Sequence, residues 1–312
     1  HPMRSLIQKL TLSLLLAFTT TTLSAQKKVC ITIDDLPVVD YGMRSLEEWQ
    51  MITDRLLSKC EQYGIPAIGF VIEGKIHKNG VLDINRAQFI ESWLKRGFDL
   101  GNHTFSHPDY HKVGYDAFTK NVIEGERYTK PLMARYGKEL KYFRHPFLRS
   151  GATKAASDSL ETFLKGRGYE PSPVTLDSDD YLFAKQYTRA LRKGDSTRMK
   201  QLGEAYVKRT EDMLHFYEKL SKATFGRDID HTYLMHANLL NADYLDELVA
   251  MFKRNGYEFA SQEEVLKDPA YQEPVTKFGG WGISWMYRWA MSTGKGTELF
   301  KEEVPLPEIL KQ

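Results

Sequence analysis

The sequence has few cysteines, no sequence repeat and no long apolar run. Cys30 and Cys60 are the only cysteines among 312 residues, so the chain can form at most one disulfide, and two buried free thiols are an equal alternative. The apolar run from Leu10 to Phe18 is too short to span a bilayer as a mature helix. We therefore expect no stable membrane insertion.

An excess of charge of either sign is also absent. The chain has 43 basic and 41 acidic residues, and the only charges in residues 1–25 are the basic Arg4 and Lys9. Without that segment the two totals are equal. A net charge near zero gives no broad electrostatic attraction for nucleic acid or an anionic membrane. It suits a neutral substrate such as a glycan.

The first 25 residues have the pattern of a secretory signal peptide. His1 and Pro2 precede Met3 and are interpreted as a cloning remnant, and the apolar run lies between a basic start and the small-residue site Leu23-Ser24-Ala25. Cleavage is expected after Ala25. No cysteine stands at that point, so no bacterial lipid anchor is expected. The sequence predicts an exported protein, periplasmic or extracellular.

From residue 28 onward, short β-branched apolar runs alternate with amphipathic segments. This alternation predicts a parallel sheet with helices around it, either open or closed into a barrel. The predicted strands are 29–33, 67–72, 98–101, 140–143, 170–176, 232–236 and 257–259. The predicted helices are 45–63, 85–96, 115–136, 153–166 and 242–254.

Two segments interrupt the alternation. Residues of about 182–225 have apolar side chains at helical spacing, which predicts a helical insert packed outside the domain, with a lid over the site as the alternative. The tail, 269–312, contains Trp281, Trp285 and Trp289 at intervals of four, which would place them on one helix face. We expect these rings to pack the tail on the 26–268 domain rather than to stack on sugars.

The predicted strand 29–33 ends in two adjacent carboxylates, Asp34 and Asp35. Pro37 prevents the strand from continuing. Neighbouring residues of a strand point to opposite sides, so one acid could bind a metal while the other moves a proton. The alternative is a pair of helix-capping aspartates.

Two histidines follow the predicted strand 98–101. His103 and His107 are four residues apart, and they can converge on one metal if the segment turns helically. This strand should end at the same sheet edge as the Asp pair, and a carboxylate with two imidazoles leaves coordination positions open, as a catalytic zinc requires. A rival pair is His107 with His111; Pro108 favours the first pair, because it should break a helix between 107 and 111.

With three later segments, these residues form an ordered series of motifs. Each of the later segments lies near the end of a predicted strand: Arg144-His145-Pro146-Phe147, Asp177-Ser178-Asp179-Asp180-Tyr181 and Leu234-Met235-His236. Together with Thr32-Ile33-Asp34-Asp35 and His103-Thr104-Phe105-Ser106-His107, they resemble the five motifs of the NodB-homology polysaccharide deacetylases, carbohydrate esterase family 4. The resemblance covers about residues 28–265.

The resemblance implies a distorted (β/α) barrel of about seven parallel strands and a function as an N-deacetylase of an amino-sugar glycan. It assigns Asp34 as the catalytic base, Asp35, His103 and His107 as ligands of one divalent metal, usually zinc, and His236 as the general acid. Arg144 would orient Asp34 and be held in turn by Asp180. The substrate side would comprise the Phe147 N–H at the oxyanion, Tyr181 at the pocket wall in place of the usual Trp, and Leu234 at the acetyl methyl group.

Three other functions fit parts of this pattern. An O-acetyl esterase acting on xylan-type glycans would use the same site, a catalytically inactive protein would only bind glycan, and an allantoinase-like relative would open a small cyclic amide. The complete set of acid, base and ligands argues against the inactive protein. Leu36 stands where the family usually has Gly, which is expected to reshape the entrance to the site.

Overall fold

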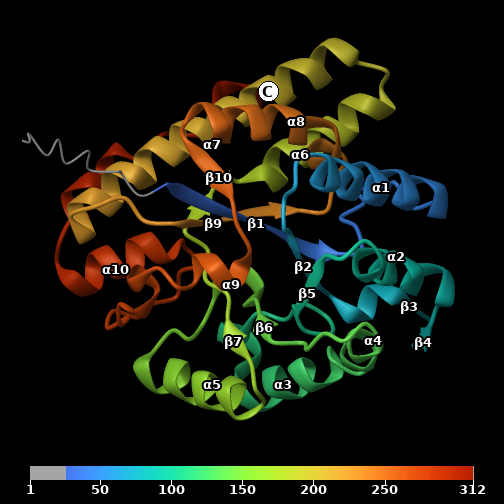
Figure 1. Ribbon diagram of the computed structural model, residues 1–312, viewed down its shortest axis with the longest axis horizontal. Coiled ribbons are helices and arrows are strands. Elements are labelled where there is room, and N and C mark those ends of the chain that lie inside the picture. Colours follow the sequence, from blue (N-terminus) through green and yellow to red (C-terminus); the bar gives the residue numbers. More distant parts are fainter. Residues whose placement is uncertain (1–25, 312) are drawn as a thin grey trace, which may run out of the picture.

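The computed structural model describes residues 26–311 and places a curled parallel sheet at the centre of the molecule, with helices around it (Figure 1). All pairings in this sheet are parallel. Its eight strands are β1 (Lys27–Leu36), β2 (Ile68–Val71), β5 (Asp99–Asn102), β6 (Tyr142–Phe143), β7 (Glu170–Pro171), β8 (Leu176–Asp177), β9 (His231–His236) and β10 (Tyr257–Phe259). The distorted barrel predicted from the sequence is confirmed.

The strand order is β7-β6-β5-β2-β1-β9-β8, and β10 pairs with the first three residues of β1. Within residues 26–311 no ladder joins the end strands β7 and β8, so the barrel has a seam there. Residues 172–175 cross this seam: Ser172 N–H donates to Phe143 O at 2.8 Å on one side, and Thr175 N–H donates to Thr232 O at 3.2 Å on the other. The seam lies beside the strands that carry Arg144 and His236.

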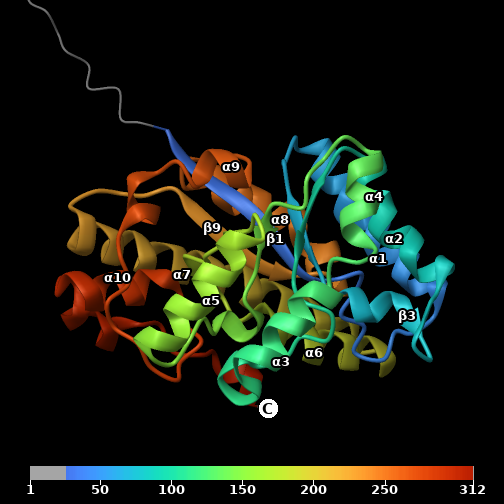
Figure 2. The same ribbon diagram turned by 90° about the horizontal axis from the view of Figure 1, so that it is seen from below.

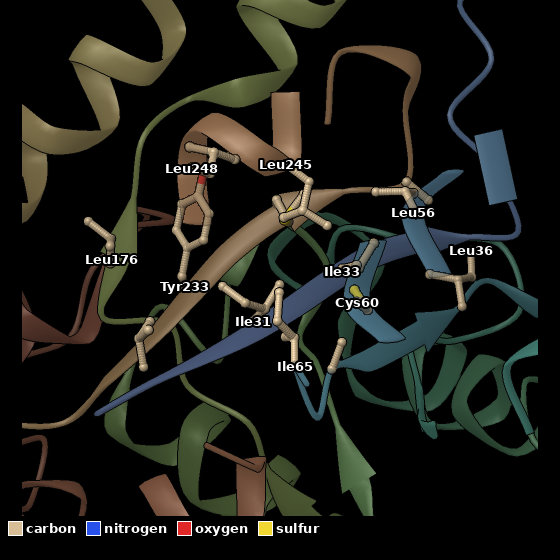
Figure 3. Close-up of a cluster of buried hydrophobic side chains, with 14 of the residues drawn as sticks. Ile31, Ile33, Leu36, Leu56, Cys60, Ile65, Leu176, Tyr233, Leu245 and Leu248 are labelled. Atoms are coloured by element: carbon tan, nitrogen blue, oxygen red, sulfur yellow. The ribbon is translucent and has the colours of Figure 1, made fainter. Parts of the chain in front are cut away.

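The central strand β1 separates two environments. Ile31 and Ile33 point toward the helices and pack in the main hydrophobic core, where Figure 3 shows them with Leu245 and Leu56. The alternate residue Thr32 contacts Arg144 instead. Full burial of an aliphatic side chain contributes about 2 kcal/mol, so the outward face of β1 fixes its register, and the register fixes where Asp34 lies.

Helices cover the outside of the sheet (Figures 1 and 2). They are α1 (Leu46–Gln62), α2 (Ile84–Lys95), α3 (Tyr110–Glu124), α4 (Thr129–Arg135), α5 (Lys154–Gly166), α6 (Asp180–Arg192), α7 (Ser196–Phe225), α8 (Leu239–Arg254), α9 (Gln262–Val265) and α10 (Trp285–Thr293). Short 3₁₀ turns are η1 (Glu73–Ile76), η2 (Pro146–Leu148), η3 (Pro269–Gln272), η4 (Thr297–Glu302) and η5 (Glu308–Lys311). Helix α1 begins with the capping box of Ser45 and Glu48.

The structure differs from the predicted elements in three places. The predicted helix 115–136 is two helices, because the chain turns near Gly125, where a Cβ would lie 2.5 Å from the backbone of Thr104. The predicted strand 170–176 is two strands at opposite ends of the sheet, β7 and β8. A small hairpin, β3 (His77–Lys78) with β4 (Val81–Leu82), was not predicted; it turns through Asn79 and Gly80, both with positive φ.

The segment predicted as a helical insert forms the helices α6 and α7, which pack against each other and against α8. The lid alternative does not describe α7, because this helix lies along the outside of the molecule (Figure 1). Helix α6 differs, since it begins at Asp180, one of the predicted site residues.

The tail helix α10 packs beside the seam. Trp285 N–H donates to Val174 O at 2.8 Å, and the Ser284 hydroxyl donates to Thr175 O at 2.7 Å. Trp289 is buried against Phe225 and Tyr271. Trp281 precedes the helix, so the prediction that all three tryptophans share one helix face is wrong.

Both cysteines are buried free thiols, with Cys30 on β1 and Cys60 on α1. Burial raises the pKa of each to about 12, which keeps them protonated and unreactive at neutral pH. Among the described residues, no helix combines the length and apolar character needed to cross a membrane. The predicted signal peptide lies outside the described residues.

Candidate active site

The Asp pair lies at the carboxyl end of β1, where the strand geometry changes. Asp34 continues the alternation and points to the same side as Thr32, toward Arg144. Asp35 has a φ of 64°, and the register of β1 against β2 shifts between Ile33 and Leu36. The left-handed turn brings Asp35 to the site as well: Asp34 Oδ2 lies 3.7 Å, and Asp35 Oδ1 3.2 Å, from Nε2 of His103.

Asp34 is held by the fully buried Arg144. Nη1 of Arg144 donates to both carboxylate oxygens of Asp34 at 3.2 Å, and Nη2 donates to the Thr32 hydroxyl at 2.9 Å. Its Nε donates to Ser172 O at 2.9 Å, and its plane packs on the Phe70 ring. These contacts leave the arginine one orientation, so Asp34 is fixed as a paired carboxylate.

The tautomer of His103 is set by its backbone partner. Nδ1 lies 2.7 Å from the carbonyl oxygen of Arg144. Because a carbonyl oxygen can only accept, Nδ1 carries the hydrogen and the lone pair of the neutral ring is on Nε2. Nε2 faces Asp35 Oδ1, so two acceptors point at each other. This is the arrangement of a metal-binding imidazole with a backbone acceptor behind it.

His107 completes the cluster. Its Nε2 lies 3.6 Å from Asp35 Oδ1, and its ring is 4.7 Å from that of His103. Burial lowers the pKa of His107 to about 4, although the Asp35 carboxylate opposes the shift. His107 is therefore neutral at pH 7 and can act as a ligand.

Asp35, His103 and His107 fit a divalent cation. One ligand atom from each lies within 4.8 Å of the other two. Asp35 Oδ1 is buried and accepts no hydrogen bond, so it is free to coordinate a cation. Burial raises the pKa of Asp35, but the positive charges of His236 and Lys75 oppose burial, and the pKa lies well below its usual range. The donor set of one carboxylate and two imidazoles is typical of a catalytic zinc site.

His236 ends β9 and is the register partner of Asp34 across the β1–β9 ladder. Its Nδ1 lies 2.7 Å from Oδ1 of Asp180. Burial alone would lower the pKa of His236, but the Asp180 carboxylate raises it to about 10. The imidazolium is thus the form present at neutral pH.

The expected contact between Asp180 and Arg144 is wrong. Asp180 Oδ2 accepts from the backbone of His236 at 2.9 Å, from Asn241 Nδ2 at 2.7 Å and from Asn238 Nδ2 at 3.2 Å. Arg144 donates to Asp34, Thr32 and Ser172 instead. Asp180 therefore acts on His236 and not on Arg144: its carboxylate orients the imidazole ring and stabilises the protonated form.

The residues predicted to contact substrate lie around these groups. The Phe147 ring is half exposed and packs 4.5 Å from His107, and its backbone has a φ of 57°. Leu234 is buried in a small apolar cluster with Leu148 and Val174, against which Trp285 packs. Tyr181 is exposed, and its ring lies 6.4 Å from that of His236.

Two sequence-based expectations do not describe this site. His111 lies outside the ligand cluster: its Nε2 accepts from Gly151 N–H at 3.0 Å, so the rival pair 107/111 is not supported. Leu36 is fully buried, and Figure 3 shows it in the core; a Cβ on Gly69 would lie 2.4 Å from its side chain. Leu36 therefore fills the space above Gly69 and does not reshape the entrance.

Left-handed backbone conformations concentrate in the motif segments. Eight non-glycine residues between 26 and 311 have positive φ, and six of them lie in or next to these segments: Asp35, Thr104, His107, Phe147, Leu148 and Asp179. Such conformations cost of order 1 kcal/mol or more each and persist where the surrounding structure enforces them. These conformations direct the side chains of neighbouring residues toward the same small region, the candidate site.

Several residues that hold the site were missed by sequence reasoning. Thr32 and Ser172 fix Arg144, Asn238 and Asn241 fix Asp180, and Lys75 Nζ donates to the carbonyls of Asp35 and Val38. Two of these residues had a sequence signal: Thr32 lies in the first motif, and Asn238 is a residue type favoured at a helix N-cap.

Comparison with known proteins identifies the same relatives as the motifs. The family described as Polysaccharide deacetylase matches residues 23–161, which include the first three motifs. A peptidoglycan-N-acetylglucosamine deacetylase of Bacillus cereus is 25% identical over 120 residues, 38% of this chain and 36% of that protein. The match thus spans little more than a third of the curated relative.

Solved structures share the fold over more of the chain. The chitin deacetylase of Colletotrichum lindemuthianum matches with a TM-score of 0.52 and 20% identity, covering 78% of this chain and 89% of that one. A Bacillus cereus polysaccharide deacetylase matches with a TM-score of 0.51 and 19% identity, over 76% and 92%. A mutant of a carbohydrate esterase family 4 pseudoenzyme has a TM-score of 0.52 and 16% identity, over 78% and 68%.

Proposed function

Because the chain belongs to the NodB-homology polysaccharide deacetylases, we propose that it is a metal-dependent hydrolase that removes N-acetyl groups from an amino-sugar glycan and releases acetate. The glycan is of the chitin-oligomer or peptidoglycan type. The observation that carries the proposal is the pairing of Asp34 with His236 across adjacent strands, with three metal-type ligands beside Asp34.

Asp35, His103 and His107 would hold the ion, with zinc expected. When bound, it supplies a Lewis acid that polarises the acetamide carbonyl and lowers the pKa of water. Asp34, fixed by Arg144, is placed to take the proton of the attacking water. The backbone N–H of Phe147 would help to stabilise the oxyanion that forms.

His236 supports the cleavage step. An amine is a poor leaving group unless it is protonated, and His236 with a pKa of about 10 carries a proton to give. The Asp180 carboxylate holds Nδ1, so Nε2 is the atom that would protonate the leaving nitrogen. Leu234, in the cluster with Leu148 and Val174, would contact the acetyl methyl group.

An O-acetyl esterase would use the same groups but would depend less on His236, because an alcohol leaves more easily than an amine. An inactive protein is also known on this fold, since one solved structure with the fold is a pseudoenzyme. The full set of base, acid and ligands in this chain favours the hydrolase.

The test is acetate release from chitin oligomers, peptidoglycan and acetylated xylan, each with and without a chelator. The proposal expects release from an N-acetylated glycan that chelation abolishes and added zinc restores. Release from acetylated xylan alone would identify an esterase. No release from any of them, with no bound metal, would overturn the proposal.

We also propose that the protein is exported, on the basis of the signal-peptide pattern in residues 1–25. Amino-terminal sequencing of protein secreted by a bacterial host should start at Gln26. A product in the cytoplasm that retains Met3 would contradict export.

A further inference from the structure

A cavity of about 820 Å³ lies between the β1–α1 loop, η1, α2 and α6. Its walls contain a single acidic residue, Asp40, and six basic ones, which together define the cationic pocket: Arg44, Lys75, Arg86, Lys185, Arg189 and Arg192. Three of the six come from α6 at intervals of four and three residues, so they project from one face of that helix.

Most of these positive charges have no acidic partner. Within residues 26–311, Arg44, Lys185 and Arg189 form no ion pair. Arg192 donates to the carbonyl of Tyr41, and Lys75 donates to backbone carbonyls. Arg86 has an acidic neighbour in Asp83, at 3.8 Å, and Asp35 and Asp40 lie near Lys75. Like charges around one cavity repel each other, so an anion in the cavity would stabilise the cluster.

The pocket adjoins the candidate active site from two sides. Lys75 Nζ lies 2.9 Å from the carbonyl oxygen of Asp35, a proposed metal ligand. Tyr41, also in the pocket wall, donates from its hydroxyl to Tyr181 O at 3.2 Å, and the Tyr181 ring lies beside His236. A glycan whose acetamide lies between Asp34 and His236 can therefore extend past Tyr181 into the pocket.

The pocket is built by close packing at one position. Gly42 has a φ of 92°, and a Cβ there would lie 1.9 Å from a guanidinium nitrogen of Arg192. Glycine thus permits the end of α6 to approach the β1–α1 loop. With Arg192 held on Tyr41, the charged wall is formed before any ligand arrives, which reduces the entropy lost on binding.

We propose that the substrate glycan carries an oxyanion, a carboxylate or a phosphate, on a sugar near the one that is deacetylated, and that the cationic pocket binds this group. The inference rests on the proposed function and adds the charge of the substrate. Arginine and lysine are the side chains that bind these oxyanions best, and the arginine fork matches their oxygens. The near-zero net charge of the chain conceals this local excess of positive charge.

Four substrates test the charge requirement. The first is a tetrasaccharide of alternating N-acetylglucosamine and N-acetylmuramic acid, and the second is the same compound with its lactyl carboxylates amidated. The third is neutral chitotetraose, and the fourth is chitotetraose phosphorylated at O6. We expect kcat/KM for one charged compound to be about tenfold higher than that of its neutral counterpart, because its KM is lower. The compound that shows the gain identifies carboxylate or phosphate.

The variant Lys185→Gln/Arg189→Gln removes two charges from the pocket. It should raise KM for the preferred charged substrate about tenfold and leave kcat and the neutral substrates unchanged. Lys193→Gln/Lys200→Gln is the matched control, because it removes two charges from the same helical hairpin outside the pocket. Calorimetric binding of the charged and neutral tetrasaccharides gives the same comparison without turnover.

Equal activity and equal binding on charged and neutral compounds would overturn the inference and leave the deacetylase proposal intact. So would a double variant that behaves like its control. Activation of neutral chitotetraose by inorganic phosphate would also overturn it, because the pocket would then bind a free effector. If none of the four compounds releases acetate, the deacetylase proposal fails. The anion inference is still tested in that case, because calorimetry shows whether the protein binds the charged tetrasaccharide more tightly than the neutral one.

Discussion

Nδ1 of His236 lies 2.7 Å from Oδ1 of the buried Asp180, and this contact sets the charge of the proposed general acid. Burial acts against the imidazolium, yet the carboxylate raises the pKa of His236 to about 10. The pKa of Asp180 is lowered in return, since His236 outweighs the effect of burial. The pair therefore remains ionised across the neutral range.

Asp180→Asn should move the basic limb of the pH profile of kcat/KM to lower pH. The carboxylate favours the charged ring, so without it burial dominates and the pKa of His236 falls. Asp179→Asn is the control, because that carboxylate pairs with Arg209 and not with His236. A basic limb at the same pH in wild type and Asp180→Asn would show that His236 does not titrate in this step.

The same pair should contribute to stability in a pH-dependent way. A pKa raised on folding stabilises the folded state fully below the unfolded value of about 6.5, and the contribution is lost as the pH rises through about 10. The difference in unfolding free energy between wild type and Asp180→Asn should therefore shrink from pH 6 to pH 10. Urea unfolding at several pH values measures it; a constant difference would contradict the linkage.

The two neighbouring aspartates should have separable roles. Asp35→Ala removes a charged ligand, so metal content and activity should both fall. Asp34→Asn should keep the metal and cost about 10²–10⁴ in rate, because only the proton acceptor is lost. Elemental analysis and acetate release measure both.

His111→Ala is the control for metal content, because His111 accepts from Gly151 and lies outside the cluster. An Asp34→Asn protein without metal would make both acids ligands. One with near-full activity would place the base elsewhere.

His236→Ala should lose far more activity on an acetamide than on an activated acetate ester. The ester's leaving group needs no proton, whereas the sugar amine does. Rates on a chitin oligomer and on p-nitrophenyl acetate give the two losses. Equal losses would identify His236 as a structural residue or a ligand.

Trp285→Ala should weaken both the fold and the site. The ring packs against Leu148, Val174 and Leu234, and Arg288 lies 4.1 Å over it. Loss of a large, partly buried ring costs roughly 2–3 kcal/mol, and the apolar cluster beside the site loses one wall. Urea unfolding and KM should both change.

Trp281→Ala, outside the helix and that cluster, is the comparison variant. A Trp285→Ala protein with wild-type stability and kinetics would show that the tail does not support the site.

The alternation of apolar runs with amphipathic segments was enough to predict a parallel sheet with helices around it, but it could not decide between an open sheet and a barrel. The barrel was implied by the family resemblance of the motifs. The Asp pair, the two histidines and His236 were predictable for a similar reason: each follows a strand, and parallel strands end at one edge. The hydrogen-bond partner of Asp180 could not be predicted from the sequence. Whether that carboxylate bonds to Arg144 or to His236 depends on the left-handed turn at Asp179 and on Asn238 and Asn241, which follow in a different element.

The division of residues 170–176 into two strands was only partly visible in the local pattern. Pro171 and Pro173 argue against one continuous strand, but only the three-dimensional closure of the sheet places Glu170 beside Tyr142 and Leu176 beside Tyr233. The cationic pocket could not be predicted from the sequence, because its charges come from four separate segments. The total charge, which is near zero, gives no sign of them.

The seam between β7 and β8 has a consequence for the order in which the site is completed. Ser284 and Trp285 bond across the seam, Gly282 lies against the carbonyl of Phe147, and Arg288 donates to the carbonyl of Leu148. These supports come from residues 282–288, far along the sequence from Asp34 and Asp35. During synthesis, the proposed metal ligands and base are therefore present long before the loop that carries the proposed oxyanion donor is braced. The finished site appears only after residues 282–288 have been added, and a chain that stops before them has the proposed ligands without the bracing.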